Sequence, residues 1–254
     1  MSARYARLQL ADGAFYARAE GDSYELLSSA PWEDGVKDTG RRVKKDDAIY
    51  LPPSDASKVV AIGQNYAKHA AEMGKPIPVE PLIFMKPKTA LNAHGAAILL
   101  PPASQEVHHE AELALVIGKK LTRVTEEEAA AAIFGVTCFN DVTARDVQKR
   151  EIQHTRAKSY DTFACCGPEL VTGIPFDDLR VVCRLNGAVK QDGRTSDMVH
   201  SPAKLVAFIS NVMTLLPGDV VSTGTPSGVG PIVAGDIVEV EIENVGVLRN
   251  VVTR

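Results

Sequence analysis

The chain has 254 residues and a formal net charge of -4 at pH 7, with 45% hydrophobic and 24% charged residues. This length suits one large domain, or a large domain with a small appendage, and the composition is ordinary for a globular protein. The weak negative charge argues against a nucleic-acid partner, and no apolar run approaches the length that crosses a bilayer. We therefore expect a small-molecule ligand rather than a nucleic acid or a membrane.

The cysteines do not form a metal-binding pattern. None has C-x-x-C spacing, and two adjacent thiols cannot easily chelate one metal ion; the four are Cys138, Cys165, Cys166 and Cys183. The first ten residues lack the apolar stretch of a secretory signal. These features predict reduced thiols in a cytoplasmic protein.

The first part of the chain is expected to form a small lobe. Three short strands are predicted there, over residues 4–10, 14–20 and 24–27. A polar, charge-rich connector at 33–47 follows them. A Pro-Pro pair then precedes the apolar strand 59–62, where a larger domain is expected to begin. We therefore divide the chain into a lobe, 1–54, and a main domain, 55–254.

Strand patterns dominate the main domain. They cover residues 82–86, 112–118, 135–141, 181–187, 219–224 and 236–243. Two helices are predicted, one after the capping box of Thr125 and Glu128, the other after Ser201 and Pro202. The turn sequences "LNGAVK" and "ENVGVL" predict hairpins. The sum is a mainly β (α+β) domain with a few short helices, without the regular strand-helix alternation of a Rossmann fold.

Two carboxylates stand at the entrance of a strand that is expected to be buried on both faces, "LALVI" at 113–117. Glu110 and Glu112 are two residues apart, as is His108, so all three side chains share one face. Buried like charges need a positive partner, and an oxygen-only ligand set suits magnesium, manganese or calcium. Asp141, at the end of another strand, is the candidate third ligand. The alternative is a group of solvated acids at strand ends.

A second pair of interest lies in "YAKHAAEM". His69 and Glu72 are three residues apart and would share a face if this segment is a short helix. A histidine oriented by a carboxylate is a competent general base. Gly63 and Gly74 bracket the segment, as expected for a lid that orders over a substrate. The alternative is an exposed helix with an incidental pair.

Other polar groups could meet an anionic ligand. Lys158, Arg145 and Gln148 offer cationic and amide groups for a carboxylate or enolate oxygen, although each alone is an ordinary surface residue. The loop "STGTPSGVG", 222–230, could present hydroxyls and backbone N–H groups, but it lacks the ending of a phosphate-binding P-loop. Five histidines show no zinc spacing and are expected to be supporting or surface groups: His94, His108, His109, His154 and His200.

Taken in order, six segments resemble the fumarylacetoacetate hydrolase family over residues 55–254: "GQNYAKHAAEM", "PLIFMKP", "HHEAELALVIGK", "NDVTARDVQ", "RAKSYDTF" and "GDVVSTGTPSGVG". The resemblance implies a β-sandwich roll of that family's type and a homodimer. It also implies Mg²⁺ or Mn²⁺, with Ca²⁺ as a further option, held by Glu110, Glu112 and Asp141. The small leading lobe is similar to that of bacterial members active on 2-oxo acids and their enols.

The same resemblance assigns roles around the metal. It implies that His69 and Glu72 form an acid/base pair on a mobile lid, with Lys158 as a further catalytic group. The residues implied to surround the substrate are Arg145, Gln148, Thr225 and Gln64. Many relatives carry a cationic or apolar residue in place of Gln64, so we expect this position to influence substrate choice.

These implications lead to a divalent-metal-dependent enzyme that acts on 2-oxo acids and their enols. If water reaches His69 and Glu72, hydrolysis of the C–C bond of an acylpyruvate is expected; if the lid excludes water, decarboxylation of an oxaloacetate-like acid is expected. The alternatives are a 2-hydroxyhepta-2,4-diene-1,7-dioate isomerase or an oxaloacetate tautomerase in aromatic or dicarboxylate catabolism. A binder of dicarboxylates without activity and a scaffold protein are further alternatives.

Overall fold

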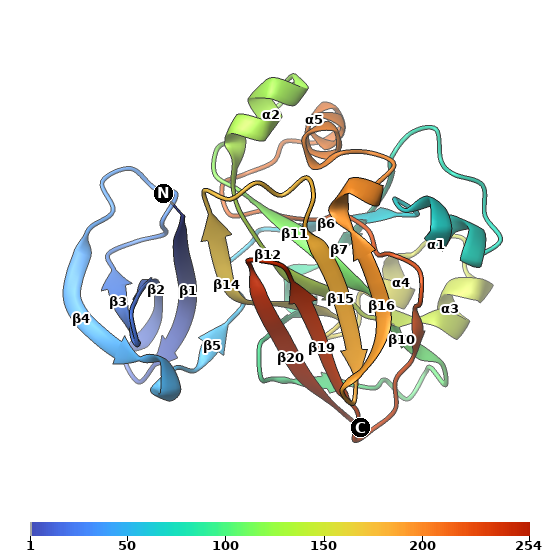
Figure 1. Cartoon of the computed structure of the whole chain (residues 1–254), viewed down its shortest axis with the longest axis horizontal. Coiled ribbons are helices and arrows are strands. Elements are labelled where there is room, and N and C mark those ends of the chain that lie inside the picture. Colours follow the sequence, from blue (N-terminus) through green and yellow to red (C-terminus); the bar gives the residue numbers. More distant parts are fainter. Residues whose placement is uncertain (1) are drawn as a thin grey trace.

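The computed structural model describes residues 2–254 and is mainly β, as predicted (Figure 1). Its largest sheet has the strand order β4-β3-β2-β1-β14-β12-β11-β17-β6-β7, with β5 paired to β1 and β8 paired to β14. These strands are β1 (Ala3–Leu10), β2 (Gly13–Glu20), β3 (Ser23–Leu27), β4 (Asp38–Lys44), β5 (Tyr50–Leu51), β6 (Val59–Gly63), β7 (Leu82–Lys86), β8 (Leu91–Ala93), β11 (Ala111–Ile117), β12 (Ile133–Asp141), β14 (Ala164–Thr172) and β17 (Val220–Ser222).

Two smaller sheets complete the fold. One has the order β16-β15-β19-β20-β9, and the other has the order β13-β10-β18. Their strands are β9 (Ala97–Leu99), β10 (Val107–His109), β13 (Thr143–Ala144), β15 (Arg180–Leu185), β16 (Ala188–Arg194), β18 (Gly230–Pro231), β19 (Ile237–Ile242) and β20 (Gly246–Thr253). Both predicted hairpins are present, β15–β16 and β19–β20. In the first, Asn186 and Gly187 have φ of 52° and 81°, as a two-residue turn with two left-handed positions requires.

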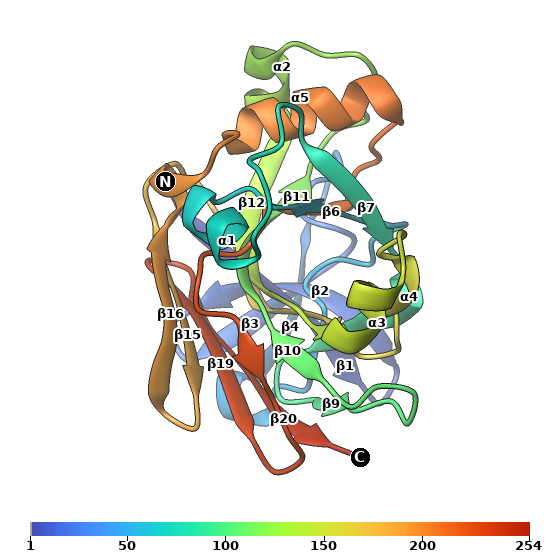
Figure 2. The same cartoon turned by 90° about the vertical axis from the view of Figure 1, so that its right-hand side faces the viewer.

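The helices are short, and two of them, α2 and α5, lie side by side at the top of the molecule in Figure 2. They are α1 (Ala67–Glu72), α2 (Glu126–Ala132), α3 (Arg145–Arg150), α4 (Thr155–Lys158) and α5 (Pro202–Val212), with 3-10 turns η1 (Lys45–Asp47), η2 (Lys88–Ala90) and η3 (Thr195–Asp197). The predicted capping box of α2 is present, with Glu128 N–H donating to Thr125 Oγ1 at 3.2 Å. None of the helices between residues 2 and 254 is long and apolar enough to cross a membrane.

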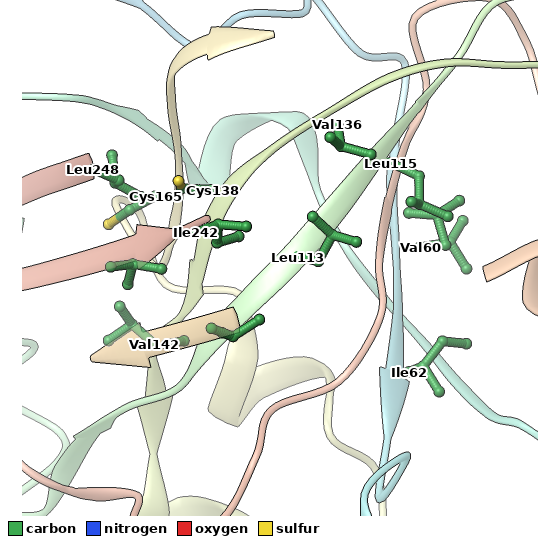
Figure 3. Packing of buried hydrophobic residues seen from close by; sticks show 14 of the residues in the cluster. Val60, Ile62, Leu113, Leu115, Val136, Cys138, Val142, Cys165, Ile242 and Leu248 are labelled. Atoms are coloured by element: carbon green, nitrogen blue, oxygen red, sulfur yellow. The ribbon is translucent and has the colours of Figure 1, made fainter. Parts of the chain in front are cut away.

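Strand β11 lies at the centre of the core, between β12 and β17, and all seven of its residues are buried. Leu113 and Leu115 point into the main apolar cluster, which Figure 3 shows together with Val60 and Val136. Val116 points to the opposite side, into a second cluster. The prediction of a strand buried on both faces is confirmed.

Two parts of the large sheet differ from the sequence expectations. Residues 33–47 were expected to be a connector, but they contain β4 and η1. Strand β4 is almost wholly exposed, so it lacks the apolar alternation that reveals a strand. Strand β14 escaped prediction because Gly167 and Pro168 interrupt it, and proline within a run argues against a strand.

The three N-terminal strands that were predicted are all present, and they extend the large sheet. Strand β1 pairs with β14 in antiparallel register, with Tyr5 opposite Leu170. The N-terminal strands also hold an apolar cluster of their own, which includes Leu8, Tyr24 and Leu26. The division into a lobe, 1–54, and a main domain, 55–254, stays a prediction. All four cysteines are buried and unpaired.

Candidate active site

A cavity of ≈ 530 Å³ opens beside the start of β11, where α1, α3, α4 and the loop after β17 converge. Figure 1 shows these three helices on one side of the molecule, away from α2 and α5. The lining includes most of the residues that the sequence singled out: Gln64, His69, Glu110, Glu112, Arg145, Gln148, Lys158 and Thr225. Glu72 and Asp141 do not line the cavity, but each contacts a lining residue: Glu72 lies against His69, and Asp141 accepts a hydrogen bond from Lys158.

The three predicted metal ligands form one buried cluster. Glu110, Glu112 and Asp141 each offer a carboxylate oxygen, and these oxygens lie within 4.8 Å of one another. The strand register explains this, because Ala111 pairs with Asn140 and Asp141 N–H donates to the Glu110 carbonyl at 2.9 Å. Oxygens this close, from hard carboxylate donors, fit a single Mg²⁺, Mn²⁺ or Ca²⁺ ion.

Three basic side chains share the cluster. Lys158 Nζ donates to Glu110 Oε2 at 2.7 Å and to Asp141 Oδ2 at 2.6 Å. Arg145 pairs with Glu110, and Lys86 pairs with Asp141. Burial alone would raise the pKa of Glu110, but the charges of Lys158 and Arg145 outweigh it and hold that pKa well below its ordinary value. Burial opposes the charge of Lys158, yet its two acidic partners raise its pKa.

Glu112 differs from the other two acids in its partners. It accepts hydrogen bonds from the Ser222 hydroxyl and from Gly224 N–H, the latter at 2.8 Å. Among residues 2–254, no basic side chain forms an ion pair with it. Burial, followed by the charges of Asp141 and Glu110, raises its pKa well above the ordinary value. A divalent cation bound beside Glu112 would favour its ionised form and lower this pKa.

The predicted helical pair is present on α1. His69 Nδ1 lies 3.0 Å from Glu72 Oε2, and His69 is buried and lines the cavity. Glu72 also accepts a hydrogen bond from Gly228 N–H at 3.0 Å, so the loop after β17 holds the carboxylate in place. Because Nδ1 is engaged, Nε2 is the ring nitrogen that is free to exchange a proton with a ligand.

Arg145 and Gln148 project from one face of α3. Arg145 Nη1 donates to Gln148 Oε1 at 2.5 Å, which leaves the Gln148 amide hydrogens for a ligand.

Gln64 lies three residues before the start of α1 and has φ of 58°, an uncommon conformation for a residue other than glycine.

The loop 222–230 differs from its expected role. It was expected to offer hydroxyls and N–H groups to an anion. The Gly224 and Gly228 N–H groups instead bind Glu112 and Glu72. The Thr225 hydroxyl donates to the Ala111 carbonyl at 2.8 Å. These donors therefore hold the protein's own groups.

Several residues in or near the cavity were not anticipated. Lys86 is completely buried beside Asp141 and does not line the cavity; the only signal for it was a lysine at the end of the apolar run "LIFMK". Lys75, Phe84 and His154 line the cavity, and the His154 ring lies against Phe84. Of the five histidines treated as supporting or surface groups, His154 alone lines this cavity, and burial lowers its pKa.

Two protein-family models match consecutive parts of the chain. A model of the fumarylacetoacetate (FAA) hydrolase C-terminal domain matches residues 58–253, and an Rv2993c-like N-terminal model matches residues 3–53. The chain belongs to the fumarylacetoacetate hydrolase family. The resemblance read from the motifs is thereby confirmed, and with it the mainly β fold of this family's type.

Members of the fumarylacetoacetate hydrolase family with similar sequences come from diverse organisms. Protein Rv2993c of Mycobacterium tuberculosis is 45% identical, covering 99% of this chain and 98% of that protein. The human mitochondrial oxaloacetate tautomerase FAHD2A is 43% identical, covering 81% of this chain and 70% of that protein. A solved 2-hydroxyhepta-2,4-diene-1,7-dioate isomerase from Mycobacterium marinum has a TM-score of 0.92 at 42% identity, covering 99% of this chain and 98% of that chain.

Proposed function

We propose that this chain is a divalent-metal-dependent enzyme that acts on 2-oxo acids and their enols. The observation that carries the proposal is the buried acid cluster, in which Glu112 has no basic partner among residues 2–254, beside the same cavity as the His69–Glu72 pair. A bound Mg²⁺ or Mn²⁺ would be held by Glu110, Glu112 and Asp141. It would supply Lewis-acid polarisation of the oxygens of a 2-oxo acid.

The chain's own residues supply binding and proton transfer. His69 Nε2 is placed to take a proton from water or from a substrate carbon, and Glu72 stabilises the imidazolium that results. Lys158 is placed to stabilise negative charge on a substrate oxygen, and the Gln148 amide is placed to donate to a second one. We propose that these groups hydrolyse the C–C bond of an acylpyruvate or decarboxylate an oxaloacetate-like acid.

A second candidate is an isomerase or tautomerase of the same class of acids. The names of the human and Mycobacterium marinum relatives favour it. Both reactions need only that a base move a proton between carbon atoms or between carbon and oxygen. The single pair of His69 and Glu72 can do so without an activated water.

A lysine at the cavity supports substrates with two carboxylates. Lys75 follows Gly74, whose φ of 64° ends α1, and Lys75 N–H closes the helix on the Ala70 carbonyl at 2.9 Å. Among the lysines and arginines of residues 2–254 that line the cavity, Lys75 alone has no ion pair within the chain. An unpaired ammonium here suits the far carboxylate of a dicarboxylate.

The deciding experiment is a turnover screen with Mn²⁺. Acylpyruvates and oxaloacetate are tested for release of pyruvate, oxaloacetate for exchange between its keto and enol forms, and unsaturated hydroxy-dicarboxylates for isomerisation. Each is repeated with EDTA and with His69→Ala. The proposal expects turnover that needs both the metal and His69. Turnover that survives EDTA would refute it, and complete absence of turnover would favour a binder.

We further propose that the protein is a cytoplasmic homodimer, each chain having a small N-terminal lobe, 1–54, and a catalytic domain, 55–254. Light scattering of the purified protein measures the mass of the assembly directly. A mass of 27.2 kDa, that of one chain, would contradict the dimer.

A further inference from the structure

A buried glutamine on β16, in the sheet β16-β15-β19-β20-β9, connects that sheet to the candidate active site. Gln191 is 1% exposed and uses both ends of its amide. Its Oε1 accepts from Ala111 N–H and from His109 Nδ1, each at 3.0 Å. Its Nε2 donates to Thr225 Oγ1 and to the Pro226 carbonyl, each at 2.7 Å. A side chain with two donors and one oxygen acceptor is thereby fully engaged.

The first consequence concerns the strand that carries the acids. Ala111 is the residue between Glu110 and Glu112. Its N–H is held by Gln191, and its carbonyl accepts from the Thr225 hydroxyl, which Gln191 also holds. The two peptide units that flank the Ala111 Cα, and that aim the two carboxylates, are therefore both held by Gln191, one directly and the other through Thr225.

The second consequence concerns the loop 224–228, which lies directly against β16. A Cβ added at Gly193 would lie 2.7 Å from Pro226 Cβ, and one at Gly228 would lie 2.1 Å from the Lys190 carbonyl oxygen. These approaches leave no space between the strand and the loop. Within residues 2–254, Gln191 is the only residue whose side-chain amide forms hydrogen bonds between β16 and this loop.

This loop in turn holds both halves of the site. Gly224 N–H binds Glu112 at 2.8 Å, and Gly228 N–H binds Glu72 at 3.0 Å. Glu112 belongs to the acid cluster and Glu72 to the acid/base pair. The position of one half relative to the other therefore depends on where β16 seats the loop.

We propose that Gln191 is a positioning residue, which sets the acid cluster and the His69–Glu72 pair at their working separation without touching the substrate. The catalytic consequence rests on the function proposed above; the structural consequence does not. Nothing in the sequence marked Gln191, because its partners lie at least 34 positions away along the chain.

The test compares Gln191→Met with a matched control. Asn250 is also 1% exposed, lies in β20 of the same sheet, and donates from Nδ2 to the Ala93 and Ala96 carbonyls at 2.7 and 2.8 Å. Asn250→Leu removes an equally buried amide that makes two hydrogen bonds and does not contact the loop. If Gln191→Met does not fold, Gln191→Glu, which keeps the acceptor for Ala111, is judged by the same criteria.

Three measurements distinguish positioning from a purely structural role. Gln191→Met is expected to weaken Mn²⁺ binding about 10- to 100-fold, the range seen when a supporting partner of metal ligands is lost. Amide hydrogen exchange of Gly224 and Gly228 should accelerate by about tenfold or more as the loop opens locally. With any substrate that the turnover screen identifies, kcat should fall by a larger factor than KM rises, because Gln191 makes no substrate contact. Asn250→Leu should lower the melting temperature and change none of these.

The proposal is overturned if Gln191→Met lowers the melting temperature as the control does while Mn²⁺ affinity and loop exchange stay within about twofold of the original protein. If the unaltered protein binds no Mn²⁺ and turns over no substrate, the proposed function fails instead. In that case the exchange of the Gly224 and Gly228 amides still decides whether Gln191 seats the loop.

Discussion

Replacing Lys158 by methionine separates the role of its charge from the role of a metal. Lys158 Nζ donates hydrogen bonds to Glu110 Oε2 and Asp141 Oδ2, which belong to two carboxylates of the acid cluster. The Lys158 side chain is almost completely buried. Methionine keeps much of the side-chain volume but leaves both acids short of one cation. We expect the metal-free variant to be destabilised and the metal-saturated variant to recover, because a divalent ion held by Glu110 and Asp141 would supply the positive charge that Lys158 no longer provides.

The structure sets the size of this effect. Removing one partner of a buried ion pair costs about 3–5 kcal/mol. Glu110 keeps Arg145 and Asp141 keeps Lys86, so we expect a loss near the lower end, about 3 kcal/mol. For a chain of this length, that loss lowers the melting temperature by about 6–12 °C. Each tenfold gain in metal affinity, once the ammonium no longer competes, restores about 1.4 kcal/mol at saturating metal.

The assay is thermal unfolding at a series of Mn²⁺ concentrations and in EDTA. Lys58→Met is the control, since Lys58 pairs with the completely buried Asp219 and does not line the cavity. The difference in melting temperature between Lys158→Met and the unaltered protein should decrease as the Mn²⁺ concentration rises. The corresponding difference for Lys58→Met should stay constant. A gap of the same size in EDTA and in saturating Mn²⁺ would show that Lys158 and a metal do not share these oxygens.

Three further predictions concern protons and substrate. The pKa of Glu112 is raised by burial and by the neighbouring acids, so without metal the carboxyl holds its proton to higher pH than a free glutamate; Mn²⁺ must displace it, and affinity should increase with pH. Calorimetry in two buffers of different ionisation enthalpy should detect the released proton, and equal heats would contradict the assignment. His69→Ala should keep metal-dependent stabilisation but lose about 10²- to 10⁴-fold in turnover, and a full rate would place the base elsewhere. Lys75→Ala should raise KM for dicarboxylates about tenfold and leave KM for monocarboxylates unchanged, whereas Lys68→Ala, on α1 but outside the cavity lining, should change neither KM.

Local periodicity was enough to anticipate the two pairs at the centre of the site. Glu110 and Glu112 share a face because side chains alternate along a strand, and His69 and Glu72 meet because helical residues three apart are neighbours. The core strand β11, the capped helices and both hairpins follow from patterns of the same kind, each confined to a few adjacent residues. Asp141 was a candidate from its place at the end of a strand, and the family motifs pointed to the same residue, although its distance in sequence from Glu110 contains no periodic signal.

Strand pairing decided the rest. The register of β11 against β12 brings Asp141 beside Glu110. Lys86, at the end of β7, forms an ion pair with Asp141. The expectation that loop 222–230 offers its donors to a ligand failed at Gly224 and Gly228, because those N–H groups face carboxylates that only the folded chain brings near them.

The sequence by itself determined which side chains carry charge and which face of its own strand or helix each one occupies, because those properties depend on residue type and local repeat. The tertiary structure alone decided which charges meet, which acid stays without a basic partner, and which buried amide ties the two sheets together. The physical reason is that a buried charge or hydrogen-bonding group takes its energy from neighbours a few ångströms away, and those neighbours come from strands far apart in the chain.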